Sequence, residues 1–239
     1  MTERLAEELA DLAIRLQDEP TVEDTLDAVL DYAVHALRCS YVGVIFVHGK
    51  ARLETAAATD PRVESLEKLQ MRLGEGPDLD VLEDRTVVLI SDTHTERRWP
   101  EWARLVAETG LRSQLAVRLY TGSNTVGTLN FYDDEPDAFD DADIDVGRIL
   151  ARHAAVALSA ARDLENLWNA VDTRKLIGQA QGILMERYRL GPDQAMAVLL
   201  RYSQDSNLKL RVVAERLVET SQLPAVPESQ APPESSALA

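Results

Sequence analysis

Two sets of residues near the end of the sequence have types and spacing that could bind another molecule. The first set recurs at helical spacing and consists of Arg174, Gly178, Gln181 and Gly182. The second set surrounds a polar turn and consists of Ser203, Asn207, Lys209 and Arg211. Residues three and four apart share one face of a helix, so the first set would form a single strip. Guanidinium and ammonium groups can hold phosphates, while amide and hydroxyl groups can hydrogen-bond to bases.

Each set also has a purely structural interpretation. Gly178 and Gly182 each cost a helix about 1 kcal/mol relative to alanine, so something must come close to the backbone there. That neighbour could be a packed helix as readily as a ligand or nucleic acid. Ser203 and Asn207 could be plain capping residues, and Lys209 could be a solvated charge. The residue pattern alone leaves these alternatives open.

The elements that would position both sets are three helices, each with one apolar face. Proline is favoured at the first helical position, so the second helix is expected to begin at Pro192. The apolar residues recur at intervals of three and four. They are Leu176, Ile177, Ala180, Ile183 and Leu184, then Ala195, Val198, Leu199 and Tyr202, then Leu210, Val213, Ala214 and Leu217. Short connections between these stripes predict a small three-helix bundle.

This segment, from about Glu165 to Thr220, resembles the ANTAR domain of bacterial transcription antiterminators. The resemblance rests on Arg174, the run from Ile177 to Met185, Ala195, Leu199, Tyr202-Ser203, Asn207, Lys209-Leu210 and Val213-Ala214. It implies that the segment binds a pair of small RNA stem-loops and so keeps an overlapping terminator from forming. The eight residues of the two sets are the RNA-binding residues that we predict. Many family members carry lysine where this chain has Gln181, which removes one phosphate-seeking charge.

The charge of the chain is unevenly distributed. The 239 residues carry a formal net charge of −16, whereas nucleic-acid binders usually have a basic surface. Residues 163–222 hold eight basic and eight acidic residues, so the excess acid lies outside the predicted RNA-binding segment. Nonspecific binding to polyanions should therefore be weak, and recognition must depend on local geometry.

Several functional classes are disfavoured by what the sequence lacks. No apolar run approaches the ~20 residues of a membrane span, and the first residues do not form a secretory signal. The single cysteine, Cys39, excludes an internal disulfide framework. Motifs of phosphate loops, zinc proteases and nucleophile elbows are missing. We therefore expect a cytoplasmic protein without membrane contact, with no enzymatic activity, catalytic residue or metal site.

Residues 19–162 predict an α+β domain with an antiparallel sheet sandwiched by helices. Strands are expected at 41–47, 51–57, 85–90, 114–120 and 125–132, and helices at 21–37, at 61–69, from Asp78 and at 99–109. The segment resembles a GAF sensory domain in Ala58-Thr-Asp60, Gly74 to Pro77, Ser113 to Leu119, Val126 to Asn130, and Phe139 with Asp143. Members of that family hold cyclic nucleotides, bilins, haem or other small molecules. The resemblance therefore allows an unidentified small-molecule ligand.

No residue pattern identifies that ligand, and no cofactor is evident. Cys39 precedes the first strand and is interpreted as a small core residue rather than a bilin attachment site. His153 falls in a helical stripe and is expected to be a packing residue. Asp78 and Asp80 lie near a helix start and are interpreted as carboxylates that compensate the helix dipole.

A nearly continuous helix over Leu150–Tyr188 is expected to join the α+β domain to the bundle, which covers 163–222. Its apolar residues from Val146 to Val171 have the spacing of a coiled-coil seam. An N-terminal helix at 1–18 carries a second stripe, Leu5, Leu9, Leu12 and Leu16, that nothing nearby in sequence covers. Together the two stripes predict a homodimer. Residues 223–239 contain four prolines and are expected to be a disordered tail.

Two functional hypotheses follow. The first is an RNA-binding transcription antitermination regulator controlled by a GAF sensor domain. The alternative is a module that senses a small molecule or contacts other proteins without binding RNA directly. The resemblance to the ANTAR domain from Arg174 to Ala214 favours the first hypothesis, and the net negative charge of the whole chain favours the second.

Overall fold

The computed structural model describes residues 3–49, 52–83, 86–122 and 124–223. The chain divides into two compact units, Met1–Glu165 and Asn166–Ala239. Within the described ranges, no helix combines the length and apolar character that crossing a bilayer requires.

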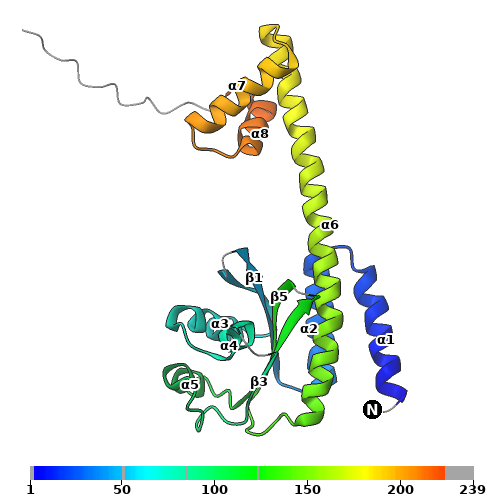
Figure 1. Cartoon of the computed structure of the whole chain (residues 1–239), viewed down its shortest axis with the longest axis vertical. Coiled ribbons are helices and arrows are strands. Elements are labelled where there is room, and N and C mark those ends of the chain that lie inside the picture. The colour runs from blue at the N-terminus through cyan, green and yellow to red at the C-terminus, as the bar shows by residue number, and fades with distance from the viewer. Residues whose placement is uncertain (1–2, 50–51, 84–85, 123, 224–239) are drawn as a thin grey trace, which may run out of the picture. The chain divides into compact units, whose positions relative to one another are not determined.

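The first unit is built on a five-stranded antiparallel sheet with strand order β2-β1-β5-β4-β3. The strands are β1 (Tyr41–His48), β2 (Arg52–Ala58), β3 (Val87–Ile90), β4 (Ser113–Thr121) and β5 (Asn124–Asp133) (Figure 1). The central strand β5 pairs with both β1 and β4, so Tyr132 lies opposite Tyr41 on one side and Gln114 on the other. The predicted α+β fold with an antiparallel sheet is confirmed.

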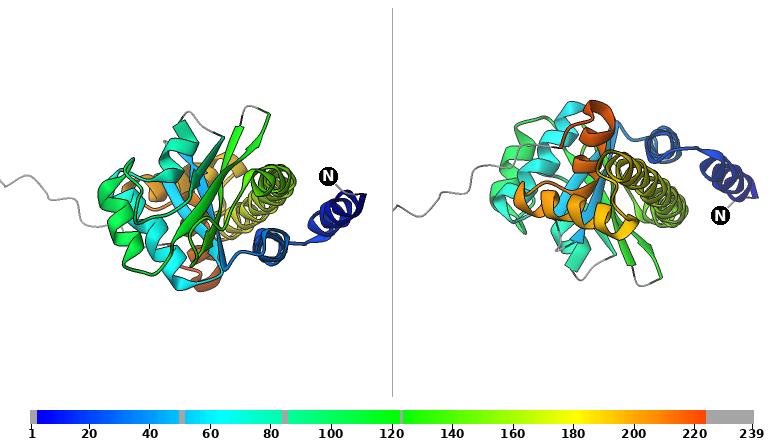
Figure 2. Two further views of the ribbon diagram at one scale, coloured as in Figure 1. Left: turned by 90° about the horizontal axis from the view of Figure 1, so that it is seen from below. Right: turned by 90° about the horizontal axis from the view of Figure 1, so that it is seen from above.

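Helices cover both faces of the sheet (Figure 2). On one face, α2 (Val22–Leu37) and the first part of α6 (Asp141–Tyr188) pack on the sheet, with α1 (Glu3–Asp18) outside them. On the other face lie α3 (Pro61–Leu73), α4 (Pro77–Glu83) and α5 (Pro100–Ala107). Alternate residues of β5 point to opposite faces, so Leu129 and Phe131 join the first core while Tyr132 joins the second.

Local hydrogen bonds explain where several helices begin and end. The Asp24 N–H donates to Thr21 Oγ1 at 3.0 Å, which caps the start of α2. Asp60 caps α3 by accepting the Arg62 N–H at 2.8 Å, and Gly74, with φ of 70°, ends that helix. Asp140 Oδ1 accepts the N–H groups that open α6.

The second half of the α1 stripe, Leu12 and Leu16, is covered by helices of the same chain, whereas the sequence favoured a partner chain. Leu12 and Leu16 are 2% and 3% exposed and belong to the same core as α2 and α6. Sequence proximity could not reveal this cover, because α6 lies more than a hundred residues further on. The burial of the Leu5 and Leu9 side chains lies outside what the structure describes.

Cys39 is 6% exposed in this core, and burial raises the pKa of its thiol to about 12. It is a packing residue, as predicted. Ala151, Ala155 and Leu158 of α6 are also buried in this core, so one face of that helix packs on the sheet.

The second unit is a three-helix bundle made from the last part of α6, α7 (Pro192–Asp205) and α8 (Leu210–Thr220). Its buried residues are the predicted ones, namely Ala180, Leu184, Ala195, Leu199, Val213, Ala214 and Leu217. The predicted continuity of the long helix is confirmed over 150–188. Leu223, which we assigned to the tail, packs against this core. The remainder of the predicted tail, 224–239, lies outside the described residues.

Candidate functional site

The glycine strip on α6 faces open space. Neither Gly178 nor Gly182 has a heavy atom within 4 Å of the position that a Cβ would occupy, beyond its own helix backbone. Arg174 is exposed one turn earlier. The alternative in which a neighbouring helix packs on these glycines is therefore wrong for the described chain, and the strip is accessible to a ligand.

Gln181 has a structural partner within the bundle. Its Nε2 donates to the carbonyl oxygen of Pro192 at 3.3 Å, and the residue is half-buried. This bond ties α6 to the first turn of α7. The N–H of Gly191 also donates to Gln194 Oε1 at 2.9 Å, so side chains of α6 and α7 both satisfy backbone groups at this helix start.

The turn between α7 and α8 is shaped by Ser203 and Asn207. Ser203 Oγ donates to the carbonyl oxygen of Leu208 at 2.6 Å, and the Leu208 N–H returns to the Ser203 carbonyl at 3.1 Å. Asn207 is exposed, and its backbone has the left-handed conformation with φ of 51°. The alternative in which Ser203 and Asn207 cap the third helix is wrong, because the N-cap of α8 is Lys209 and no side chain among the described residues caps it.

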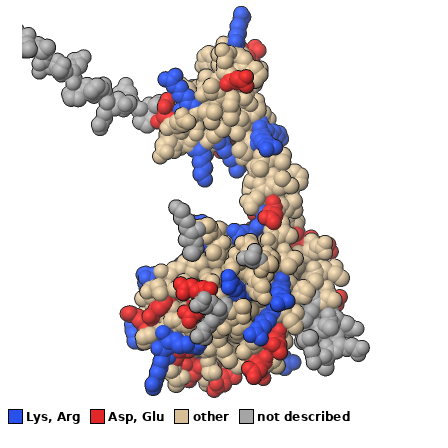
Figure 3. Space-filling model, in the orientation of Figure 1, with Lys and Arg blue, Asp and Glu red and all other residues tan. Residues whose placement is uncertain are grey.

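Three cations of the two sets are available to an anion. Arg174, Lys209 and Arg211 are exposed, and within the described residues none of them forms an ion pair. Lys209 stands at the N-terminus of α8, where the helix dipole favours negative charge. On the side drawn in Figure 3, Lys and Arg side chains project from several places on this unit. The bundle can thus offer cations, an amide and an open backbone strip to a polyanion.

The first unit contains a group of largely buried polar side chains that the sequence analysis did not bring together. They lie between the sheet and helices α3 and α4, and we call them the buried polar centre. Its members are Thr55, Glu67, Gln70, Asp78, Thr128, Asn130 and Tyr132. Glu67 and Asp78 are both 0% exposed.

The interpretation of Asp78 as a charge that compensates a helix dipole is wrong. The Gln70 side chain makes two hydrogen bonds to Asp78. Its Oε1 accepts the Asp78 N–H at 3.0 Å, and its Nε2 donates to Asp78 Oδ2. Burial raises the pKa of Asp78, whereas hydrogen bonds from Thr128, Asn130 and Gln70 oppose the rise. The environment of the Asp78 carboxyl is therefore determined by tertiary contacts and not by its position at the start of α4.

Burial also raises the pKa of Glu67 well above its usual range, and the nearby Asp78 carboxylate raises it further. The centre could have been suspected from the spacing on α3. Glu67 and Gln70 fall four and seven residues after the buried Val63, which places both on the inner face of that helix. On β5, Thr128, Asn130 and Tyr132 alternate with apolar residues, a pattern that usually indicates a solvated face.

A GAF domain family model matches residues 19–159, which is more than half of the chain. The chain therefore belongs to the GAF domain family. An ANTAR domain model matches residues 165–218, so the chain is a GAF–ANTAR protein. This combination assigns it to the general class of signal-responsive transcription antitermination regulators.

Solved structures show the same fold in the first unit. The GAF domain of a phosphoenolpyruvate-protein phosphotransferase from Coxiella burnetii is 18% identical with a TM-score of 0.57, covering 68% of this chain and 96% of that one. The corresponding GAF domain from Acinetobacter is 14% identical with a TM-score of 0.55, covering 70% and 99%. A bacteriophytochrome from R. palustris is 11% identical with a TM-score of 0.59, covering 86% and 47%. At these identities the likeness shows the fold alone. No curated protein matches the chain.

Proposed function

We propose that the C-terminal bundle binds paired stem-loops in nascent mRNA and that the GAF domain controls this binding in response to a signal. The observation that carries the proposal is the open strip on α6, where Gly178 and Gly182 keep a helix face bare beside the exposed Arg174. Helix propensity alone would favour alanine at both positions, so a close approach by a hairpin loop accounts for the glycines.

The side chains divide into three roles. Arg174, Lys209 and Arg211 bear mainly on the RNA backbone, because cations contact phosphates without reading sequence. Asn207 is exposed, its side-chain amide has no hydrogen-bond partner among the described residues, and it bears on the choice of loop bases. Ser203 and Gln181 have partners within the bundle, so they act chiefly by holding the turn and the α6–α7 junction in place.

The proposal is tested by fluorescence anisotropy with a tandem-hairpin RNA and a matched scrambled RNA. Arg174→Ala should weaken binding by about tenfold, the loss of one or two charge-assisted contacts. Lys175→Ala is the control, since Lys175 is an exposed cation one residue further on but points about 100° away around the helix. Equal affinity of the parent chain for hairpin and scrambled RNA, or equal losses in the two variants, would contradict the proposal.

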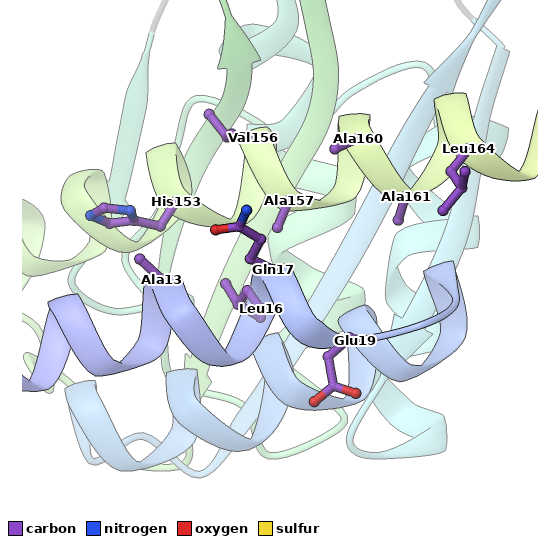
Figure 4. Close-up of a pocket in the computed structure, with 10 residues that line it drawn as sticks. All are labelled: Ala13, Leu16, Gln17, Glu19, His153, Val156, Ala157, Ala160, Ala161 and Leu164. Carbon is purple, nitrogen blue, oxygen red and sulfur yellow. The ribbon is translucent and has the colours of Figure 1, made fainter.

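We infer that the protein acts as a homodimer. A groove of about 440 Å³ lies between α1 and α6 and is lined mainly by apolar side chains (Figure 4). Beside it, Val156 and Leu164 are 62% and 47% exposed, and Leu167 and Val171 continue the same spacing on α6 with 61% and 47% exposed. A second copy would present an identical stripe with coiled-coil spacing, which makes this surface self-complementary.

This function needs no reaction to be catalysed, so we propose a regulator rather than an enzyme, acting in the cytoplasm where nascent transcripts are made. The alternative is a module in which the exposed stripe of α6 docks other proteins and RNA is not bound directly. The net charge of −16 favours that alternative, and the scrambled-RNA comparison separates the two.

A further inference from the structure

A polar pocket in the first unit lies at the edge of the sheet, beside the first part of α6. The edge strand β3 begins at Val87, which pairs with Val117, so residues 118–121 of β4 extend past it. The pocket has a volume of about 270 Å³, and we call it the arginine pocket. It is lined by Thr86, Val117, Arg118, Tyr120, Arg148 and Arg152. It is separate from the buried polar centre, because α6 packs on the opposite face of the sheet from α3 and α4.

The arginine pocket concentrates positive charge in an acidic chain. Three of its lining residues are arginines and none of the described ones is acidic, although the chain as a whole has a net charge of −16. Arg148 and Arg152 lie four residues apart on α6 and therefore share one face of the helix. Two like charges at this spacing repel each other, so helix stability does not account for their placement.

Little of this charge is neutralised within the described part of the chain. Arg118 and Arg152 form no ion pair with any described residue. Arg148 Nη1 lies 3.7 Å from Asp145 Oδ1, but the Asp145 side chain is 74% exposed. An ion pair this exposed is screened by water and salt and is weak. The pocket therefore keeps a net positive charge.

Neutral partners hold two of the guanidinium groups in place. Arg118 Nε donates to Thr125 Oγ1 at 3.0 Å, and Arg118 Nη2 donates to the same oxygen. Arg152 Nη2 donates to the Tyr120 hydroxyl oxygen at 3.2 Å. Each guanidinium has five N–H donors, so both arginines retain donors that no described residue accepts. Hydroxyl groups thus orient the two side chains without removing their charge, which is what a site for an anion requires.

We propose that the arginine pocket binds the phosphate group of a small phosphorylated molecule. Phosphate accepts paired N–H bonds from guanidinium groups, and its oxygens point in several directions. One phosphate group can therefore contact arginines from β4 and from α6 together. An adjoining pocket of about 300 Å³ shares Thr86, Arg118 and Tyr120 and is completed by Gly122 and Thr125, which gives room for the rest of the molecule.

This inference goes beyond the proposed function, because the pocket does not depend on RNA binding. A bound phosphate group would connect β4 to the first part of α6 and would offset the repulsion between Arg148 and Arg152. A ligand that binds only the folded chain stabilises it. Occupancy should therefore raise the unfolding temperature, which provides a readout independent of RNA.

The test uses two probes, sodium methyl phosphate and sodium succinate, at about pH 8, where both are dianions. Calorimetric titration of the full chain, at an ionic strength held constant with sodium chloride, should show methyl phosphate binding at least about tenfold more tightly than succinate. Arg118→Gln and Arg152→Gln should each lower the methyl phosphate affinity by about tenfold or more. Arg104→Gln is the control, because it removes an exposed cation of α5 outside the pocket and should leave the affinity within about twofold.

Arg148→Gln serves as a further variant if Arg118→Gln does not fold, since Arg148 is exposed. No binding of methyl phosphate by the parent chain, or equally tight binding of succinate, would overturn the inference. Equal losses of affinity in Arg104→Gln and in the pocket variants would also overturn it, because they would show that the anion responds only to the charge of the whole surface.

Titration with the tandem-hairpin RNA distinguishes a small phosphorylated molecule from the phosphates of RNA. The pocket variants should bind this RNA as tightly as the parent chain does. Weaker RNA binding by these variants would show that the pocket contacts the RNA backbone and would overturn the inference. A chain that binds methyl phosphate but no hairpin RNA would contradict the proposed function and leave this inference standing.

Discussion

Gly43 in β1 lies directly beneath Glu67 of α3, such that a Cβ on the glycine would approach the carboxyl oxygen Oε1 to 2.3 Å and Val63 Cγ1 to 2.7 Å. Both neighbours are fully buried and neither can swing into solvent. Gly43→Ala is therefore expected to lower the free energy of unfolding by about 1–3 kcal/mol, the usual cost of overpacking a core. Chemical denaturation of the full chain measures this loss.

Gly49→Ala is the control for that substitution. Among the described residues, no heavy atom beyond its own chain neighbours lies within 4 Å of the position that its Cβ would occupy. It should leave the unfolding free energy within about 0.5 kcal/mol of the parent value, as for most surface changes. Similar losses in both variants would mean that the packing of Glu67 on β1 is not what makes Gly43 necessary.

The raised pKa of Glu67 predicts a stability that depends on pH. The folded chain keeps a proton on this carboxyl at pH values where the unfolded chain has released it, because the ordinary pKa of glutamate is about 4.3. The unfolding free energy should fall as the pH rises from there, with each such group contributing at most about 1.4 kcal/mol per pH unit. Asp78, whose pKa is also raised, acts in the same direction.

Denaturation at several values between about pH 5 and pH 8 tests this dependence. Glu67→Gln should flatten the fall in stability, while Glu23→Gln, which alters an exposed carboxylate on α2, should keep it. The low pKa of Asp92, held by the Arg112 guanidinium, does not interfere because its contribution is lost only in stronger acid. An equally steep fall in Glu67→Gln would show that this carboxyl is not the titrating group.

The glycine strip of α6 predicts opposite effects on stability and on RNA binding. Gly182→Ala should stabilise the free chain by about 1 kcal/mol, because alanine has the higher helix propensity and its Cβ would contact no described residue outside its own helix backbone. The same change should weaken binding of the tandem hairpin, since a methyl group would stand between the helix backbone and the RNA loop. Thermal unfolding measures the change in stability, and fluorescence anisotropy on the same preparation measures the change in RNA affinity. A variant that is more stable and binds equally well would exclude a close approach at this position.

Lys209 at the start of α8 should contribute affinity without sequence preference. Lys209→Ala is expected to weaken binding to all hairpins alike and to reduce the slope of log affinity against log salt by about one. Asn207→Ala should instead reduce the difference in binding affinity between RNAs with the cognate loop sequence and RNAs with an altered loop sequence. Titrations at several salt concentrations with two loop sequences distinguish these behaviours, and a Lys209→Ala chain with an unchanged salt slope would remove Lys209 from the interface.

The sequence predicts most of the fold because each helix carries a single apolar stripe. The buried residues of the bundle, from Ala180 to Leu217, follow directly from that spacing. Prediction from local sequence patterns fails where packing against a segment far away in the sequence determines whether a residue is buried. Asp78 has the position of a residue that compensates the helix dipole, yet the sheet and Gln70 bury it.

The turn before α8 shows the same limit within the predicted RNA-binding residues. Ser203 and Asn207 are typical capping residues by type, but Asn207 takes a left-handed conformation and the Ser203 hydroxyl bonds to Leu208. Whether these groups cap a helix or shape a turn depends on one backbone angle, and residue type does not determine it. The openness of Gly178 and Gly182 likewise required the packed bundle, because spacing could not show which neighbour is near.

The exposed stripe of α6 predicts a dimer that a single charge should break. Leu164 is 47% exposed and lies beside the groove between α1 and α6 (Figure 4). Light scattering of the parent chain at micromolar concentration should report twice the chain mass of 26.5 kDa. Leu164→Asp should shift the chain to a monomer, because an unpaired carboxylate would be buried at the seam. Leu200→Asp is the control, since Leu200 is 41% exposed on α7 outside the stripe. A parent chain that is already monomeric, or a dimer that both variants retain, would show that α6 does not form the seam.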